Sequence, residues 1–204
     1  LPISTDFAFD SESGSVFYTP AQFNRSNTFG LEWETVYNVN MNIAIRFNGV
    51  LQNPIATEWR IYNPNGTVNT DDDIVIDYSK NTLPFNPRLM LNLGCEYGKG
   101  PFDLFLQAQY MGNREGNIAN AFELPSYTVF NGGGNFNFSK NLEIGLTINN
   151  LFNSAGLANF FGANSFGSNA NGESMDFIQN NPNESFVVVP ILPRAASLRV
   201  RYTL

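Results

Sequence analysis

The sequence predicts an all-β protein whose strands form an antiparallel sheet of a transmembrane β-barrel. Apolar and polar residues alternate with a period of two along most of the chain, whereas helical periodicity is nearly absent. Tyrosines recur near the ends of the alternating segments, and tight turns alternate with long polar connections. Period-two alternation indicates strands with one apolar and one polar face. Aromatic rims and short turns confined to one side are typical of barrels that cross membranes.

The composition is consistent with this fold class. The chain has 204 residues, of which 43% are hydrophobic, 14% aromatic and only 14% charged. A soluble protein usually has about 25% charged residues. No apolar run approaches the roughly 18 residues of a transmembrane helix, but barrel strands of about 9–11 residues carry a much weaker signal. The composition therefore fits a sheet that is apolar on one face and wet on the other.

The scarcity of reactive side chains excludes several function classes. The chain contains no histidine and one cysteine, which excludes His-based metal sites, Ser-His-Asp triads, an internal disulfide and multi-cysteine metal sites within it. The net charge of −7 argues against nucleic acid, which needs clustered Lys and Arg. We expect no enzymatic activity and no catalytic, cofactor-binding or metal site. No signal peptide is found in the sequence, which starts at Leu1 rather than Met, and we interpret this as an interior or processed start.

Three pairs of alternating segments are joined by tight turns, which predicts three antiparallel hairpins. The clearest segment sets Leu142, Ile144 and Leu146 against Glu143 and Gly145. The paired segments are 29–37 with 41–51, 88–97 with 102–111, and 127–138 with 142–152. The turns between them are 38–40, 98–101 and 139–141. These hairpins supply six of the strands that the sequence predicts.

The last predicted strand runs from Ala196 to Leu204, again with apolar residues at every second position. It brings the prediction to seven strands, and the first 20 residues could supply an eighth. The remaining connections are long and polar, at 55–86, 112–125 and 153–190. Tight turns on one side and long loops on the other match a membrane barrel. A soluble sandwich has no reason to segregate its loop lengths in this way.

The charged residues of the strands all point away from the apolar set. They are Glu32, Glu34, Arg46, Arg88, Glu96, Asp103, Glu143, Arg199 and Arg201. In a membrane barrel this face lines a wet lumen, whereas in a soluble sandwich it would be the solvent surface, and periodicity alone does not separate the two. The aromatics favour the barrel. Tyr37, Tyr97, Tyr110 and Tyr202 lie near strand ends on the apolar face, and Trp33 lies within a turn's reach.

Several residues are candidate sites by their chemistry. The run Asp71-Asp72-Asp73 lacks the spacing of a Ca²⁺ loop and fits a solvated acidic loop better. The pair Glu32 and Glu34 fits a lumen face with paired charges better than a catalytic pair of carboxylates. We expect Cys95 to be buried or lipid-facing rather than reactive. The Phe/Asn-rich segment 159–167 could contact a substrate or a lid protein, or pack against neighbouring loops. Arg114 and Glu115 could simply stabilise their loop.

Six short motifs occur in an order that resembles the C-terminal barrel of TonB-dependent receptors, especially those of Bacteroidetes-type bacteria. The motifs are Arg25 to Glu32 with Gly-x-Glu, Leu83 to Pro87, Tyr110 to Arg114, Leu124 to Tyr127, Asn149 to Asn153 with Asn-Leu-Phe, and Pro193 to Ala196. The resemblance covers about Asn24 to Leu204. It implies that residues 1–204 form the C-terminal part of a barrel of about 22 strands. Short turns would be periplasmic and long loops extracellular. Leu204 stands where the family usually ends in Phe, and the family's plug domain is not in this chain.

The resemblance also implies a function. The family imports scarce nutrients across the Gram-negative outer membrane with energy delivered by TonB, and the substrate class (siderophore, vitamin, glycan or peptide) stays open. Implied partners are outer-membrane lipid, the rest of the barrel and its plug, TonB and, in the starch-utilisation branch, a surface lipoprotein lid. The ligand-binding residues are unknown. A passive porin, a structural or secretion-associated barrel and a soluble β-sandwich binding module are the alternatives.

Overall fold

The computed structural model describes residues 6–10, 15–19, 25–63, 74–161 and 187–203. Seven strands form one antiparallel sheet in the order β15-β12-β11-β8-β7-β4-β3. The strands are β3 (Arg25–Asn40), β4 (Ile43–Glu58), β7 (Leu89–Lys99), β8 (Phe102–Met111), β11 (Tyr127–Asn137), β12 (Leu142–Asn149) and β15 (Ala195–Tyr202). These strands confirm the predicted all-β antiparallel class and all three predicted hairpins.

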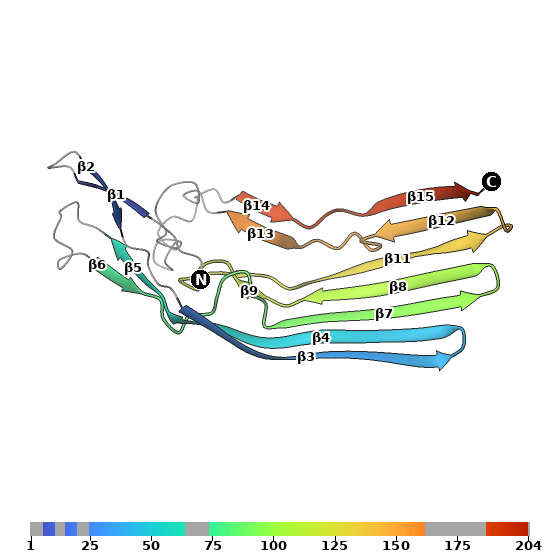
Figure 1. The fold of residues 1–204 in the computed structure, drawn as a ribbon, viewed down its shortest axis with the longest axis horizontal. Helices are drawn as coiled ribbons and strands as arrows, with labels where there is room; N and C mark the ends of the chain where they lie inside the picture. The colour runs from blue at the N-terminus through green and yellow to red at the C-terminus, as the bar shows by residue number, and fades with distance from the viewer. Residues whose placement is uncertain (1–5, 11–14, 20–24, 64–73, 162–186, 204) are drawn as a thin grey trace.

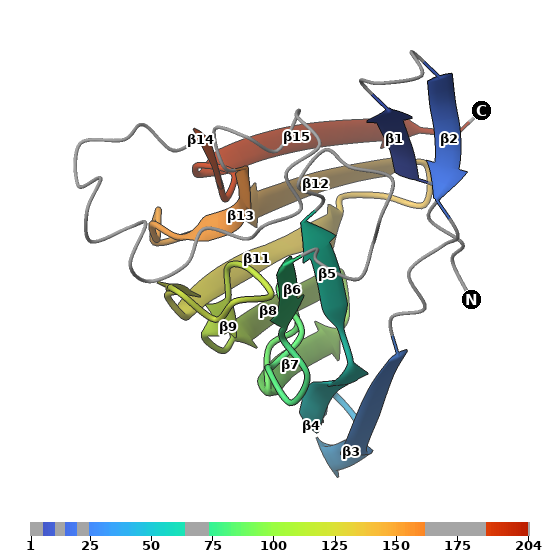
Figure 2. The same ribbon diagram turned by 90° about the vertical axis from the view of Figure 1, so that its left-hand side faces the viewer.

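The sheet is curved and has two different ends. Tight turns join β3 to β4, β7 to β8, and β11 to β12 at one end, which we call the turn end, and β15 also finishes there (Figure 1). The long connections emerge at the other end, the loop end. Figure 2 views the molecule from the loop end and shows the strands arranged along an open arc. No helix among the described residues is long and apolar enough to cross a membrane.

Short hairpins lie before β3 and within the long connections, and the sequence did not predict them. The pairs are β1 (Asp6–Asp10) with β2 (Ser15–Thr19), β5 (Arg60–Asn63) with β6 (Ile74–Asp77), β9 (Arg114–Glu115) with β10 (Glu123–Leu124), and β13 (Leu157–Phe161) with β14 (Val187–Pro190). The first pair corrects one expectation. Residues before 20 do not add an eighth strand to the described sheet, because β1 and β2 pair with each other.

The first tight turn is displaced from its predicted position at 38–40. The strand β3 continues to Asn40, and the turn occupies residues 41 and 42. The side-chain Oδ1 of Asn40 accepts hydrogen bonds from the backbone N–H groups of Asn42 (2.8 Å) and Ile43 (3.0 Å). Such side-chain-to-backbone bonds mimic a backbone turn. The reversal therefore begins after Asn40, because that residue supplies the acceptor.

The pairing register keeps one face of the sheet apolar from edge to edge. Leu106, for example, lies opposite Cys95 on one side and Gly132 on the other. We call this face the apolar face, and its large exposed members are Phe29, Leu31, Tyr37, Phe47, Leu51, Leu93, Phe102, Leu104, Leu106, Ile144, Leu146, Leu198, Val200 and Tyr202. Their exposed fractions run from 37% to 82%. No second layer of the described residues covers this face.

Burial in the described part of the chain is concentrated at the loop end instead. The buried hydrophobic residues are Ala56, Ile118, Ala121 and Leu124, and Pro54, two positions before Ala56, is fully buried as well. A soluble sandwich would bury its apolar face against a second sheet. A contiguous exposed apolar face of this extent marks contact with a membrane or a partner. The structure therefore matches the wall of a transmembrane barrel, with lipid outside and water inside.

Aromatic side chains gather on the apolar face at the turn end. Tyr97 and Tyr202 pair with the first residues of β4 and β12, and Tyr37 pairs with the third residue of β4. Phe102 and Phe136 have ring centroids 4.9 Å apart at the same end. Such a belt is expected where a barrel wall crosses the membrane–water interface. Trp33 is different, because it lies in the middle of β3.

Candidate functional site: the polar face and the loop end

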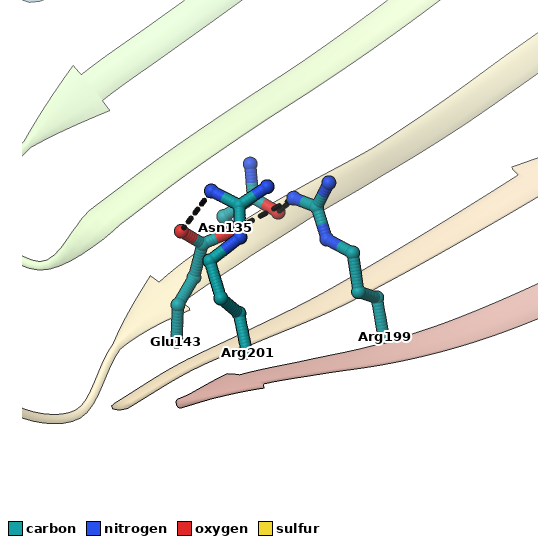
Figure 3. Close-up of polar contacts among 4 residues, drawn as sticks. All are labelled: Asn135, Glu143, Arg199 and Arg201. Atoms are coloured by element: carbon teal, nitrogen blue, oxygen red, sulfur yellow. Dashed lines mark hydrogen bonds and ion pairs between the residues drawn. The ribbon is translucent and has the colours of Figure 1, made fainter. Parts of the chain in front are cut away.

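The opposite face of the sheet, which we call the polar face, carries a charge cluster near the turn end. Glu143 on β12 accepts hydrogen bonds from Arg199 Nη2 (2.7 Å) and, more weakly, from Arg201 Nη1 (3.5 Å) on β15. Arg199 Nη2 also donates to Asn135 Oδ1 on β11 at 3.2 Å. Figure 3 shows the four side chains converging above three neighbouring strands. The two guanidinium groups share a single carboxylate, so the cluster carries a net positive charge.

A glycine makes room for this cluster. Asn135, Gly145 and Arg199 occupy one row across β11, β12 and β15. A methyl group at Gly145 would lie 2.6 Å from Asn135 Oδ1 and 3.6 Å from Arg199 Nε. Arg199 therefore reaches across β12 only because the intervening position has no side chain. This arrangement gives the polar face a fixed local geometry.

Further polar pairs cross the sheet on the same face. Arg46 Nε donates to Glu96 Oε1 at 3.1 Å, and both side chains are about half exposed. Asn92 Nδ2 donates to Asn48 Oδ1 at 2.9 Å on the next row toward the loop end. Paired, hydrated groups of this kind are what a wet lumen allows. Their chemistry supports contact with water, a solute or a protein segment rather than covalent catalysis.

Two predicted candidates lie on the polar face of the edge strand β3. Glu32 and Glu34 are exposed, and neither forms an ion pair with another described residue. The prediction of paired charges is therefore not met at these two positions within the described chain. No group of three or more His, Cys, Asp or Glu residues that could hold a metal ion occurs in the described ranges.

The loop end holds a network that joins two connections far apart in sequence. Asn120 Oδ1 accepts from the backbone N–H of Thr82 (2.8 Å), and Asn120 Nδ2 donates to the Thr82 carbonyl (2.8 Å). Asn81 Nδ2 donates to the Ile118 carbonyl at 2.9 Å, and Arg88 Nη2 donates to Thr82 Oγ1 at 3.0 Å. Thr82 is 8% exposed. Sequence patterns do not reveal this network, because the bonds of Asn120 and Asn81 join residues more than 30 positions apart and follow no period.

Glu115 lies beside this network at the loop end. Burial raises the pKa of its carboxyl group above the ordinary value, and the nearby carboxylate of Glu123 raises it further, while Arg88 acts in the opposite direction. Asn113 Nδ2 donates to Glu123 Oε2 at 2.7 Å. The group is partly solvated, so it can change its proton occupancy when the surrounding pH falls.

The Asn-Leu-Phe segment forms a turn that ties β12 to β15. Asn150 is 2% exposed and has a positive φ of 51°. Its Nδ2 donates to the carbonyls of Ser154 (2.9 Å) and Leu192 (3.0 Å), and its Oδ1 accepts from the Ser154 N–H (2.8 Å). Asn153 Oδ1 accepts from the Arg194 N–H at 3.0 Å. Asparagine tolerates the left-handed conformation and satisfies the local backbone, which explains both asparagines of this segment.

The sequence of the chain matches a known family. The match is to the family described as TonB dependent receptor-like, beta-barrel, and it covers residues 3–151. The chain belongs to this TonB-dependent receptor β-barrel family. The predicted resemblance is thus confirmed at the level of the family, whereas nothing here shows a Bacteroidetes or starch-utilisation branch. No curated protein matches the chain.

Several solved structures have the same fold as this receptor segment. The siderophore receptor PiuA from Acinetobacter baumannii covers 96% of the chain at 18% identity with a TM-score of 0.64, and the chain covers 23% of it. The ferric yersiniabactin uptake receptor FyuA from Yersinia pestis covers 90% at 14% identity with a TM-score of 0.64. The copper transporter OprC covers 97% at 18% identity with a TM-score of 0.57. The segment spans about a quarter of the length of these structures.

Of the other sequence candidates, Cys95 and the start of segment 159–167 lie among the described residues. Cys95 is exposed on the apolar face between Ile45 and Leu106, which agrees with a lipid-facing thiol. Asp71, Asp72 and Asp73 lie outside the described residues. Of segment 159–167, only the first three positions are described, as the end of β13. The structure therefore assigns no ligand contact to any residue singled out from the sequence.

Proposed function

We propose that this chain forms part of the wall of a TonB-dependent outer-membrane transporter that imports a scarce nutrient. The observation that carries the proposal is the seven-stranded antiparallel sheet with an exposed apolar face and a hydrated, charged polar face. In a barrel these faces contact lipid and lumen respectively. The family match supports the transporter class, because this is a family of receptors rather than enzymes. The location is then the outer membrane of a Gram-negative bacterium.

We propose that residues 1–204 are the C-terminal part of a single barrel domain of about 22 strands. The strand directions support this view. Because neighbouring strands alternate in direction, β3 and β15 both run from the loop end to the turn end. Pairing these two edges directly would be parallel, so an all-antiparallel barrel needs an odd number of further strands between them. The plug and those strands would come from sequence outside this chain.

The substrate class stays within the range of scarce nutrients. The similar solved structures are called a siderophore receptor, a ferric yersiniabactin uptake receptor and a copper transporter. These names favour a chelated or free metal ion as the first substrates to test, with vitamins, glycans and peptides as the next. TonB, acting through the plug, would supply the energy. A surface lipoprotein lid is a further expected partner if the chain belongs to the starch-utilisation branch.

The test is uptake with and without TonB in the native host. The gene that encodes this chain is deleted, and growth is measured with iron, copper, cobalamin or a glycan as the limiting nutrient. We expect a growth defect on one of them that the full-length gene corrects, and no correction in a strain without functional TonB. Uptake that continues without TonB would instead indicate a passive porin and would overturn the proposal. A gene copy lacking the codons for residues 1–204 serves as the control.

A further inference from the structure

One buried arginine joins two separate connections at the loop end. Arg114, at the start of β9, is 5% exposed. Its Nη2 donates to the backbone carbonyl oxygens of Leu157 (2.5 Å) and Ala158 (2.9 Å), which begin β13. Its guanidinium carbon lies 5.6 Å from the ring centroid of Tyr127 on β11. A single side chain of the connection after β8 thus contacts both the start of β11 and the connection after β12.

The backbone of the β13 side is shaped to fit this contact. A methyl group at Gly156 would lie 2.8 Å from Tyr127 Cγ, so only glycine lets the chain approach the ring this closely. The carbonyl of Gly156 accepts a hydrogen bond from the Ile191 N–H at 3.0 Å. The contact therefore continues into the segment that leads to β15. Arg114, Tyr127 and Gly156 form one packed stack, which we call the rim stack.

Neutral groups surround the buried charge of Arg114 in the rim stack. A buried charge needs compensation, which usually comes from an opposite charge. Arg114 forms no ion pair with any described carboxylate, and its Nη1 has no hydrogen-bond partner among the described residues. The two carbonyl oxygens and the Tyr127 ring face therefore supply most of its compensation. Detaching β13 would return the guanidinium to water, which offsets part of the loss of those contacts.

We propose that Arg114 is a latch that holds the β13–β14 hairpin against the rim of the barrel. While the latch is closed, the start of β13 lies on Tyr127 and the hairpin has a fixed position at the loop end. When it opens, the hairpin separates from β9 while the sheet stays intact. Arg114 is thus a positioning residue, which fixes an outer element without itself contacting a solute. The latch concerns the fold and is independent of which nutrient the receptor carries.

The test is amide hydrogen exchange on the full-length receptor in lipid nanodiscs. R114Q removes the charge and the forked donor, and we expect the amides of β13 to exchange about tenfold to hundredfold faster. R114K keeps the charge but loses the planar guanidinium over the Tyr127 ring, so its exchange should be intermediate. G156A pushes the chain off Tyr127 and should accelerate the same amides without touching Arg114. The β7 and β8 amides should be unchanged in all three variants.

The matched control is R88Q. Arg88 also lies at the loop end, and among the described residues its side chain donates to Thr82 rather than to β13. We therefore expect R88Q to leave exchange in β13 at its original rate. Two results would overturn the latch: unchanged β13 exchange in R114Q, or equal acceleration throughout β7, β8 and β13. If R114Q fails to fold, R114K decides instead, and unchanged β13 exchange in that variant would overturn the latch.

Discussion

The assignment of the two faces can be tested with neighbouring residues on one strand. Leu106 and Gln107 are adjacent on β8 and project from the apolar face and the polar face respectively. L106R places a guanidinium toward lipid, whereas Q107R places the same group toward the lumen. Gln107 faces Gly94 and Asn131 in its row, so the polar face has room for a longer side chain. The two variants carry the same added charge and differ only in the face that receives it.

The expected cost follows from the depth of Leu106 in the wall. It lies four residues from Phe102, which is about 13 Å along the strand at 3.3 Å per residue. With a strand tilt of about 40°, this corresponds to roughly 10 Å of height in an apolar band about 25 Å tall. Leu106 is therefore close to the midplane, where an outward arginine costs about 2–4 kcal/mol. F102R, at the aromatic rim, should cost only about 0–1 kcal/mol.

The assay is folding of the full-length receptor into phospholipid vesicles. The free energy of unfolding is taken from urea titrations, with folded barrel identified by its heat-modifiable mobility in gels. We expect Q107R to have the same free energy of unfolding as the unchanged receptor, F102R a slightly lower one and L106R the lowest. The difference between Q107R and L106R should be at least about 2 kcal/mol. Equal losses for L106R and Q107R would show that the two faces do not differ in environment, and the barrel assignment would fail.

Three further predictions address the polar face and the loop end. E143Q leaves Arg199 without its carboxylate, so stability should fall by about 1 kcal/mol at low salt and less at high salt, as urea midpoints at two ionic strengths would show. N150A removes three hydrogen bonds of a buried side chain and should lower the local free energy of unfolding by about 2–4 kcal/mol. The amides before β15 should then exchange faster. Unchanged exchange would contradict the role of Asn150 in this turn. The raised pKa of Glu115 means that its folded-state value lies above the unfolded one, so protonation favours the folded loop. Stability of β9–β10 should therefore rise as the pH falls from neutral toward the window just above 4.5. E115Q should abolish this rise in protection factors, and persistence of the rise would assign it to another group.

The barrel strands could be predicted because each fact needed was local. Along β12, Ile144 and Leu146 alternate with Glu143 and Gly145, so the choice of face follows from neighbouring residues. Register follows as well, because a slip of one residue would turn Glu143 toward lipid. Tight turns then fix which strands pair, and the sheet order repeats the chain order from β7 to β15.

The loop end could not be predicted in the same way. The strand β9 has two residues, which is too short for any period to appear. The bonds between Asn120 and Thr82, and between Arg114 and Leu157, join residues about 40 positions apart. An arginine between polar neighbours carries no sign that it will be 5% exposed. Asn150 is the exception, since the Asn-Leu-Phe motif marked it before its contacts were known.

The contacts of the polar face could be predicted in part. Alternation predicted which charges share it, but the pairs depend on geometry that alternation does not contain. Arg199 reaches Asn135 because Gly145 separates them, which the register reveals and the sequence alone does not. Glu32 and Glu34 share the face and form no ion pair within the described chain. Alternation therefore identifies the face, while the identity of each partner depends on which row the residue occupies.

The short hairpins within the long connections affect how far the loop sequences of related chains can differ. Arg60 and Asp77 face each other at the base of the β5–β6 hairpin, with Nε and Oδ2 3.4 Å apart. A hairpin closed at its base returns the chain to the wall at a fixed place, whatever the length of sequence inserted beyond it. Loop-closure entropy grows only slowly with length, so insertions there are cheap. Residues at the hairpin tips can therefore differ between related chains while the strands of the wall keep their pairing register.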